Sequence, residues 1–137
     1  MTLHRPGGIM KTELTLLVCA IGLTVVQMVI AVLGALLQVG LPALAGNREG
    51  LPEISGWPGR AIRAHRNMLE SLVLFAALVL VVSVAGRSNG QTVLGAELFI
   101  WARLAYAVIY LIGIPWLRTL AWAVSMLGLV LMFLQVM

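Results

Sequence analysis

Charged residues are scarce in this sequence. Only 10% of its 137 residues are Asp, Glu, Lys or Arg, and aspartate is absent altogether. Soluble globular domains carry about a quarter of their residues as charged side chains. Since 61% of the residues are also hydrophobic, the composition excludes a soluble multidomain enzyme and indicates an integral membrane protein.

Cysteine and histidine are scarce too, with Cys19, His4 and His65 as their only representatives. A single cysteine excludes an intrachain disulfide, and so few candidate ligands argue against a metal centre, so we expect no metal site. We interpret Cys19 as a small apolar residue of the first helix rather than a nucleophile. The formal net charge of +4 does not indicate nucleic acid binding, because the basic residues lie at helix ends and within helices rather than on a soluble face.

The chain contains enough apolar sequence for four membrane crossings, since each crossing needs about 20 apolar residues. Glycine and proline are concentrated in residues 42–59, which predicts one main loop there. We therefore predict a single transmembrane domain over residues 1–137. Its fold class is an all-α four-helix bundle of the integral membrane type, with helices at about 12–41, 60–85, 91–114 and 117–136.

Basic residues are unevenly distributed over the two sides of this predicted bundle. More of them lie in or next to the main loop and the third loop than on the opposite side. The positive-inside rule therefore places the main loop in the cytoplasm, in a bacterial inner membrane or an equivalent membrane. The larger set is Arg48, Arg60, Arg63, Arg66 and Arg118, and the smaller is Arg5, Lys11 and Arg87.

The start of the second predicted helix carries a polar face. A basic collar at the membrane surface would account for its arginines. However, a carboxylate deeper than such a collar is costly unless it is paired inside the bundle, so we expect Glu70 to have a partner. The residues that share an arc of about 120° at about 100° per residue are Arg60, Arg63, Arg66, Asn67 and Glu70.

The third predicted helix offers that partner. Arg103, Tyr106 and Tyr110 share one of its faces, and a rise of about 1.5 Å per residue places Arg103 at the depth of Glu70. We predict a Glu70–Arg103 ion pair; the alternative is that such a pair only fixes the register of the two helices. The same count sets each tyrosine beside residues of the second helix, Tyr106 beside Asn67, and Tyr110 beside Arg63 and Arg66.

Above this pair the spacing predicts a funnel lined by Arg63, Arg66, Tyr110 and Arg118. Such a funnel suits a small polyanion, because arginine binds carboxylates bidentately and these bonds strengthen in a low dielectric. His65 points away from this face. The sequence contains no recognisable Ser-His-acid set, carboxylate pair or Gly-rich phosphate loop, so binding of a small anion is the leading hypothesis.

Two motifs in this region resemble a known family. They are Arg63-Ala-His-Arg-Asn-Met-Leu-Glu70 and Arg103-Leu-Ala-Tyr-Ala-Val-Ile-Tyr110, followed by Gly113, Pro115 and Arg118-Thr119. They are similar to those of the MAPEG family, the membrane-associated proteins in eicosanoid and glutathione metabolism, which include the microsomal glutathione transferases. The resemblance in topology covers the whole chain, and the specific motifs cover about residues 59–122.

The resemblance implies a homotrimer of four-helix protomers that binds glutathione, as a co-substrate, between neighbouring subunits. It also implies that Arg118, helped by Thr119, stabilises the glutathione thiolate for attack on a lipophilic electrophile or hydroperoxide arriving from the bilayer. This is the activity of a transferase or peroxidase. The candidate glutathione-binding residues are Arg63, Arg66, Asn67, Glu70, Arg103, Tyr106 and Tyr110.

Departures from the family pattern leave other functions open. Tyr106 stands where some eicosanoid-converting members have a histidine, and Trp122 stands where a tyrosine can occur. One alternative is a non-catalytic protein that binds a lipid or a partner membrane protein in the same clefts between subunits. Another is a small transporter or channel, with Glu70 and Arg103 lining its pathway.

Overall fold

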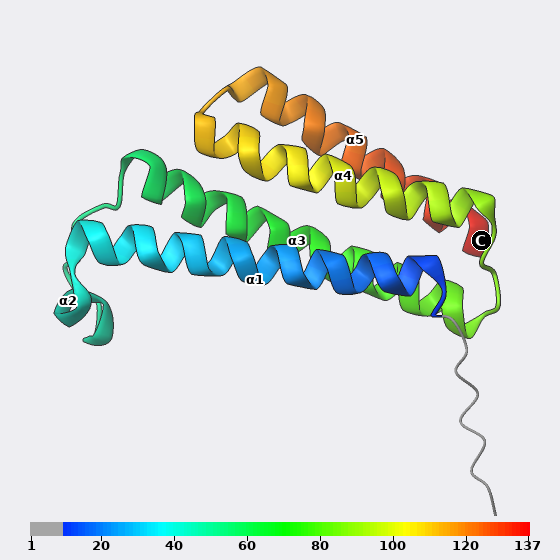
Figure 1. The fold of residues 1–137 in the computed structure, drawn as a ribbon, viewed down its shortest axis with the longest axis horizontal. Coiled ribbons are helices and arrows are strands. Elements are labelled where there is room, and N and C mark those ends of the chain that lie inside the picture. Colours follow the sequence, from blue (N-terminus) through cyan, green and yellow to red (C-terminus); the bar gives the residue numbers. More distant parts are fainter. Residues whose placement is uncertain (1–9) are drawn as a thin grey trace, which may run out of the picture.

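The computed structural model describes residues 10–137, which form five helices. Four of these are long and apolar enough to cross a membrane, and α2 is a short helix outside them (Figure 1). This confirms the predicted all-α architecture with four helices able to span a membrane. His4 and Arg5, used in the sequence analysis, lie outside the described residues. The helices are α1 (Thr12–Val39), α2 (Leu41–Ala45), α3 (Gly56–Val84), α4 (Gly90–Ile112) and α5 (Pro115–Val136).

The helix ends follow from local sequence. α3 begins at Gly56, about one turn before the predicted start, because Pro58 falls in the first turn, where a proline leaves no helical hydrogen bond unmade. α4 begins with a capping box in which the side chains of Asn89 and Thr92 each accept a hydrogen bond from the other's backbone N–H. It ends at Gly113, whose φ of 91° is left-handed. The short α2 lies inside the predicted main loop and was not predicted.

The four long helices pack as two antiparallel pairs. α1 lies along α3, and α4 lies along α5 with the most extensive contact in the described chain. Contacts of α4 with α3 and α1 join the two pairs. Figure 1 shows the α1–α3 connection and the α4–α5 turn at one end of the bundle, which we call the loop end. The α3–α4 turn, the start of α1 and the C-terminus lie at the opposite, terminal end.

Close backbone approach explains the intimate α4–α5 contact. A Cβ added to Gly95 would lie 2.6 Å from the carbonyl oxygen of Gly128, so the two helices touch through glycines. Small residues let membrane helices approach closely enough for their backbones to be in van der Waals contact. Next to this crossing, Phe75 of α3 stacks on Phe99 of α4 with ring centroids 4.1 Å apart, which ties the two pairs together.

A buried carboxylate closes the terminal end. Glu13 in the first turn of α1 is 1% exposed and accepts hydrogen bonds from the hydroxyls of Ser88 at 2.7 Å and Thr92 at 2.6 Å. The latter two residues belong to the α3–α4 turn and the start of α4. The carboxylate therefore ties α1 to that turn. Nothing in the sequence pattern singled out Glu13, because its partners lie far along the chain.

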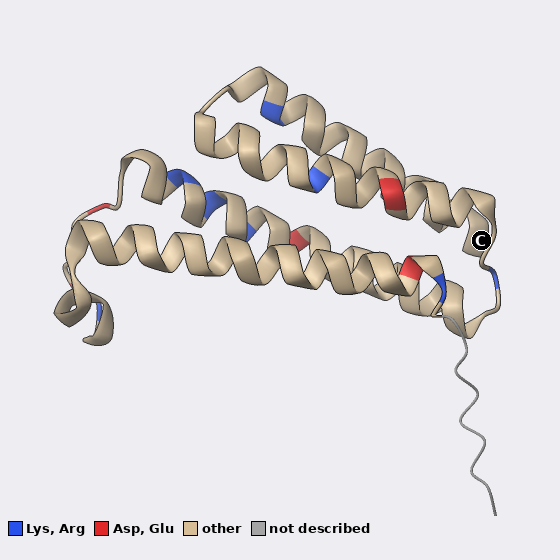
Figure 2. Ribbon diagram, in the orientation of Figure 1, with Lys and Arg blue, Asp and Glu red and all other residues tan. Residues whose placement is uncertain are grey.

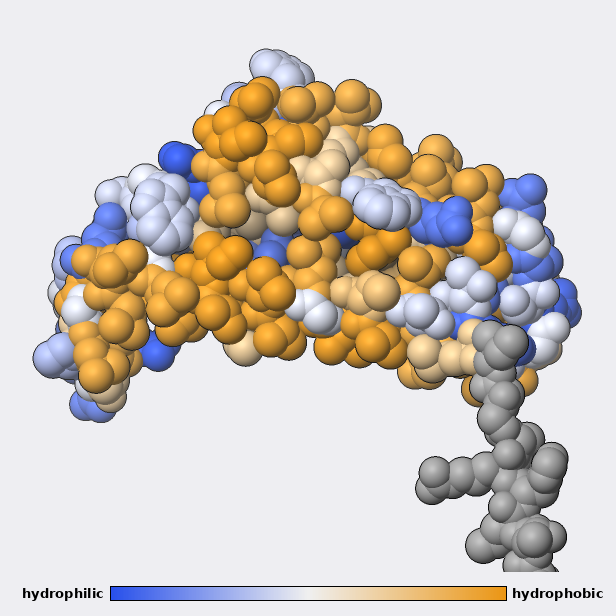
Figure 3. Space-filling model, viewed as in Figure 1, coloured by the Kyte–Doolittle hydropathy of each residue, from blue (hydrophilic) through white to orange (hydrophobic). Residues whose placement is uncertain are grey.

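The outer surface of the bundle is largely apolar. In the view of Figure 3, hydrophobic residues cover the spanning helices and hydrophilic residues gather toward the two ends. Leu37, Val84 and Trp116 are among the most exposed of the large apolar side chains. Such a surface suits contact with lipid or with other membrane-embedded chains rather than with water.

Candidate functional site

Basic residues from three helices gather toward the loop end of the bundle. Figure 2 shows a series of them along the first half of α3, with further basic positions on α4 and α5. The side chains considered below, here called the arginine site, are Arg63 and Asn67 of α3, Arg103, Tyr106 and Tyr110 of α4, and Arg118 of α5.

Tyr110 is the meeting point of two arginines from different helices. Arg63 of α3 donates from Nε to the Tyr110 hydroxyl at 3.2 Å. From the other side, the Arg118 guanidinium carbon lies 4.5 Å from the centre of the Tyr110 ring, within range of a cation–π contact. The predicted proximity of Tyr110 to Arg63 is therefore confirmed. Arg118 reaches the same ring because the tight turn at Gly113 and Pro115 brings the start of α5 back alongside α4.

Arg103 occupies the deepest position of the site and is 1% exposed. Its Nη1 donates a short hydrogen bond to the side-chain carbonyl of Asn67, while its Nε and Nη2 have no hydrogen-bond partner among residues 10–137. The guanidinium carbon also lies 5.1 Å from the centre of the Tyr106 ring. A neutral amide and an aromatic face thus surround a buried guanidinium, two nitrogens of which have no acceptor among residues 10–137.

The prediction of a Glu70–Arg103 ion pair is wrong for this structure. Arg103 bonds Asn67 instead, and none of its hydrogen bonds involves Glu70. Asn67 and Glu70 lie one turn apart and about 60° apart around α3. The orientation of α3 turns Asn67 toward α4 and leaves Glu70 exposed. The predicted depths correctly set this part of α3 beside Arg103. Depth alone, however, does not determine which residue of α3 bonds to Arg103.

Glu70 and Arg103 nevertheless line one small cavity. It has a volume of about 150 Å³ and lies between α3, α4 and α5. Sequence analysis did not assign Ser71, Leu74 or Met126 to the site, because they are ordinary helix residues whose proximity depends on how the helices pack. The full lining is Asn67, Glu70, Ser71, Leu74, Arg103, Trp122 and Met126.

The other candidate residues lie around the arginine site and differ in the contacts that they make. Arg66 is exposed on α3. Tyr106 packs edge-on against Tyr110, with ring centroids 5.5 Å apart. The Thr119 hydroxyl donates to the carbonyl of Pro115 at 3.1 Å, a bond within its own helix. Arg60 donates to the carbonyl of Leu111 at 3.1 Å and so serves the end of α4 instead of the cluster.

The arrangement of these side chains is chemically suited to an anion. Arg63, Arg103 and Arg118 bring positive charge from three helices to one place, and guanidinium groups bind carboxylates through paired N–H donors. Within residues 10–137, no group of three or more His, Cys, Asp or Glu side chains is placed to hold a metal ion.

Comparison with known proteins agrees with this geometry. The model of the MAPEG family matches residues 13–137, a range that includes the whole arginine site. A search of curated proteins gave no significant match. With nearly the entire chain matched and four helices able to span a membrane, this chain belongs to the MAPEG family of membrane proteins in eicosanoid and glutathione metabolism.

Proposed function

We propose that the protein is a glutathione-dependent transferase or peroxidase that acts on lipophilic electrophiles or hydroperoxides dissolved in the membrane. The observation that carries the proposal is the convergence of Arg63 and Arg118 on Tyr110, next to the buried Arg103, whose Nε and Nη2 nitrogens are unpaired among residues 10–137. Buried cations in a membrane protein are costly and mark functional sites. Family membership directs the choice of anion to glutathione.

Glutathione offers complementary groups: two carboxylates, one ammonium and one thiol. Arg63, Arg66 and Arg103 would bind its carboxylates, since arginine matches the geometry of a carboxylate. Glu70, exposed on the same face of α3, would bind the ammonium. Asn67, Tyr106 and Tyr110 would orient these groups through hydrogen bonds and ring contacts.

Arg118 is proposed to hold the thiol end of glutathione. A guanidinium next to sulfur favours the thiolate, which is the reactive nucleophile. Attack on an electrophilic carbon forms a C–S bond and expels the leaving group with its electron pair. With a hydroperoxide, the thiolate takes one oxygen and releases an alcohol, and a second thiol then yields the disulfide and water. Thr119 could donate a hydrogen bond to sulfur only after releasing the carbonyl of Pro115.

We further propose that the site is completed by a neighbouring copy in a homotrimer. Arg66 and Glu70 are exposed on the protomer, yet both lie within the membrane-spanning helix α3. Charged side chains in a membrane face a protein interior or a water-filled cleft rather than lipid. The cavity of about 150 Å³ beside Arg103 is also smaller than the roughly 300–1,000 Å³ of small-molecule sites. A second copy packed on this face would enlarge and enclose it, with the loop end toward the cytoplasm.

The decisive experiment is a glutathione titration of the purified protein, followed by ultraviolet difference absorbance of the thiolate. Wild type is compared with Arg118→Ala and with Arg87→Ala, a control in the α3–α4 turn at the opposite end of the bundle. We expect a saturable thiolate signal in wild type and Arg87→Ala that is lost in Arg118→Ala. Glutathione binding without a thiolate signal in the wild type would refute the enzyme proposal and favour a non-catalytic protein that binds a lipid or a partner in the same cleft.

A further inference from the structure

A second polar position lies in the middle of α1, away from the arginine site. Gln27 is 7% exposed, and its side-chain oxygen Oε1 is buried without a hydrogen-bond partner in the described part of the chain. An unsatisfied amide inside a membrane protein costs free energy, since no water is available in the hydrocarbon core to compensate. A ligand that donates a hydrogen bond to Gln27 Oε1 would remove this cost.

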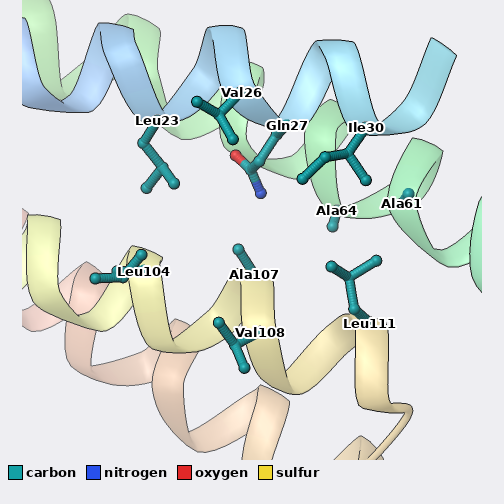
Figure 4. A pocket seen from close by; sticks show the side chains of 10 residues that line it. All are labelled: Leu23, Val26, Gln27, Ile30, Ala61, Ala64, Leu104, Ala107, Val108 and Leu111. Atoms are coloured by element: carbon teal, nitrogen blue, oxygen red, sulfur yellow. The ribbon is translucent and has the colours of Figure 1, made fainter. Parts of the chain in front are cut away.

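Gln27 points into a cavity between α1, α3 and α4. Figure 4 shows its amide directed toward the space in front of Ala64 and Ala107, with apolar side chains on all sides. The cavity has a volume of about 150 Å³. Apart from Gln27 its lining is entirely apolar: Leu23, Val26, Ile30, Ala61, Ala64, Leu104, Ala107, Val108 and Leu111.

This cavity is separate from the arginine site, because no residue lines both it and the cavity beside Arg103. Its outer rim includes Val26, Leu104 and Val108, which are exposed on the outside of the protomer. A molecule dissolved in the bilayer can therefore enter laterally. Gln27 is only 7% exposed, so a partner has to enter the cavity to reach the amide.

We propose that this cavity binds a small lipophilic molecule that carries a hydroxyl group. A cavity of about 150 Å³ lined by apolar side chains accommodates a benzene-sized ring. A hydroxyl can donate to the Gln27 carbonyl and accept from its NH₂ group, so it complements both ends of the amide. The small side chains of Ala61, Ala64 and Ala107 create the space that the ring would fill. This binding requires neither glutathione nor the arginine site.

The proposal can be tested with two fluorinated probes of nearly the same size. The full-length protein is reconstituted in nanodiscs of a saturated phosphatidylcholine, whose acyl chains carry no hydroxyl. Binding of 4-fluorophenol and 4-fluorotoluene is followed by ¹⁹F NMR, with empty nanodiscs as the correction for lipid partitioning. We expect the phenol to bind wild type about five- to tenfold more tightly, the ratio typical of one additional hydrogen bond.

Two variants make the result specific. Gln27→Met keeps the length of the side chain and removes the amide, so it should bind both probes equally. Ala107→Leu fills the cavity and should bind neither. Equal affinities in wild type, or an unchanged preference for the phenol in Gln27→Met, would overturn the proposal. A change of oligomeric state between wild type and Gln27→Met would also overturn it, because the amide would then serve contact between copies of the chain.

Discussion

The hydrogen bond between Asn67 and Arg103 provides a sharp test of the site's internal architecture. Arg103 is buried, and Asn67 is the one residue among 10–137 that accepts a hydrogen bond from it. Replacing Asn67 by Ala leaves that cation without a partner, and hydrogen bonds to charged groups are worth about 1.5–3 kcal/mol. Neutral hydrogen bonds in membrane proteins contribute less, about 0.6 kcal/mol on average. Because the acceptor here faces a charge, we expect Asn67→Ala to lower the free energy of unfolding by about 2 kcal/mol.

The matched comparison is Glu70→Ala, one helical turn away. Glu70 is exposed and makes no hydrogen bond to Arg103, so its removal from the isolated protomer should cost less than about 0.5 kcal/mol, as for other surface substitutions. Unfolding would be followed by circular dichroism in mixed micelles with increasing SDS, without glutathione and at one fixed protein concentration. The protein concentration is chosen so that the protein is monomeric. The change in unfolding free energy then reports contacts within one chain and none between copies.

A double substitution separates lost bonding from lost packing. Replacing Asn67 by Leu and Arg103 by Met removes both polar partners together, and exchanging a buried polar pair for apolar residues is often nearly neutral. We expect the double variant to be more stable than Asn67→Leu alone. If Glu70→Ala lowers the free energy of unfolding of the monomer more than Asn67→Ala does, Arg103 is stabilised mainly by the Glu70 carboxylate. That result would refute the reasoning.

Three further predictions concern the rest of the molecule. Gly128→Ala should destabilise the protein by about 1–3 kcal/mol in the same SDS titration, because the added methyl group meets the backbone of α4; a neutral result would show that α4 and α5 can separate freely. Glu13→Ala should cost about 2 kcal/mol, because the hydroxyls of Ser88 and Thr92 each lose their hydrogen bond to the carboxylate, whereas Glu97→Ala, at an exposed position, serves as a near-neutral control. Tyr110→Phe removes the hydroxyl that Arg63 contacts and should weaken glutathione binding severalfold, as measured by calorimetry. An unchanged affinity would show that the Tyr110 hydroxyl does not contribute to binding.

Much of the fold and part of the site were predictable from the sequence. Long apolar stretches without charges have few alternatives to membrane-spanning helices, because the bilayer requires every backbone hydrogen bond to be made within the helix. Helical periodicity then assigned Arg63 and Asn67 to one face of α3, and Arg103 and Tyr110 to one face of α4. The Arg63–Tyr110 contact follows from these two faces and their matching depths.

Tertiary structure decided which residues on those faces become partners. The choice of Asn67 over Glu70 for Arg103 depends on how far α3 is rotated toward α4, an angle that packing around Phe75 and Phe99 helps to set. The burial of Glu13 and the orphaned amide of Gln27 depend likewise on contacts with distant segments. The physical reason is that sequence periodicity determines the angle and depth of a residue on its own helix, whereas the rotation and separation of helices arise only when all of them pack together.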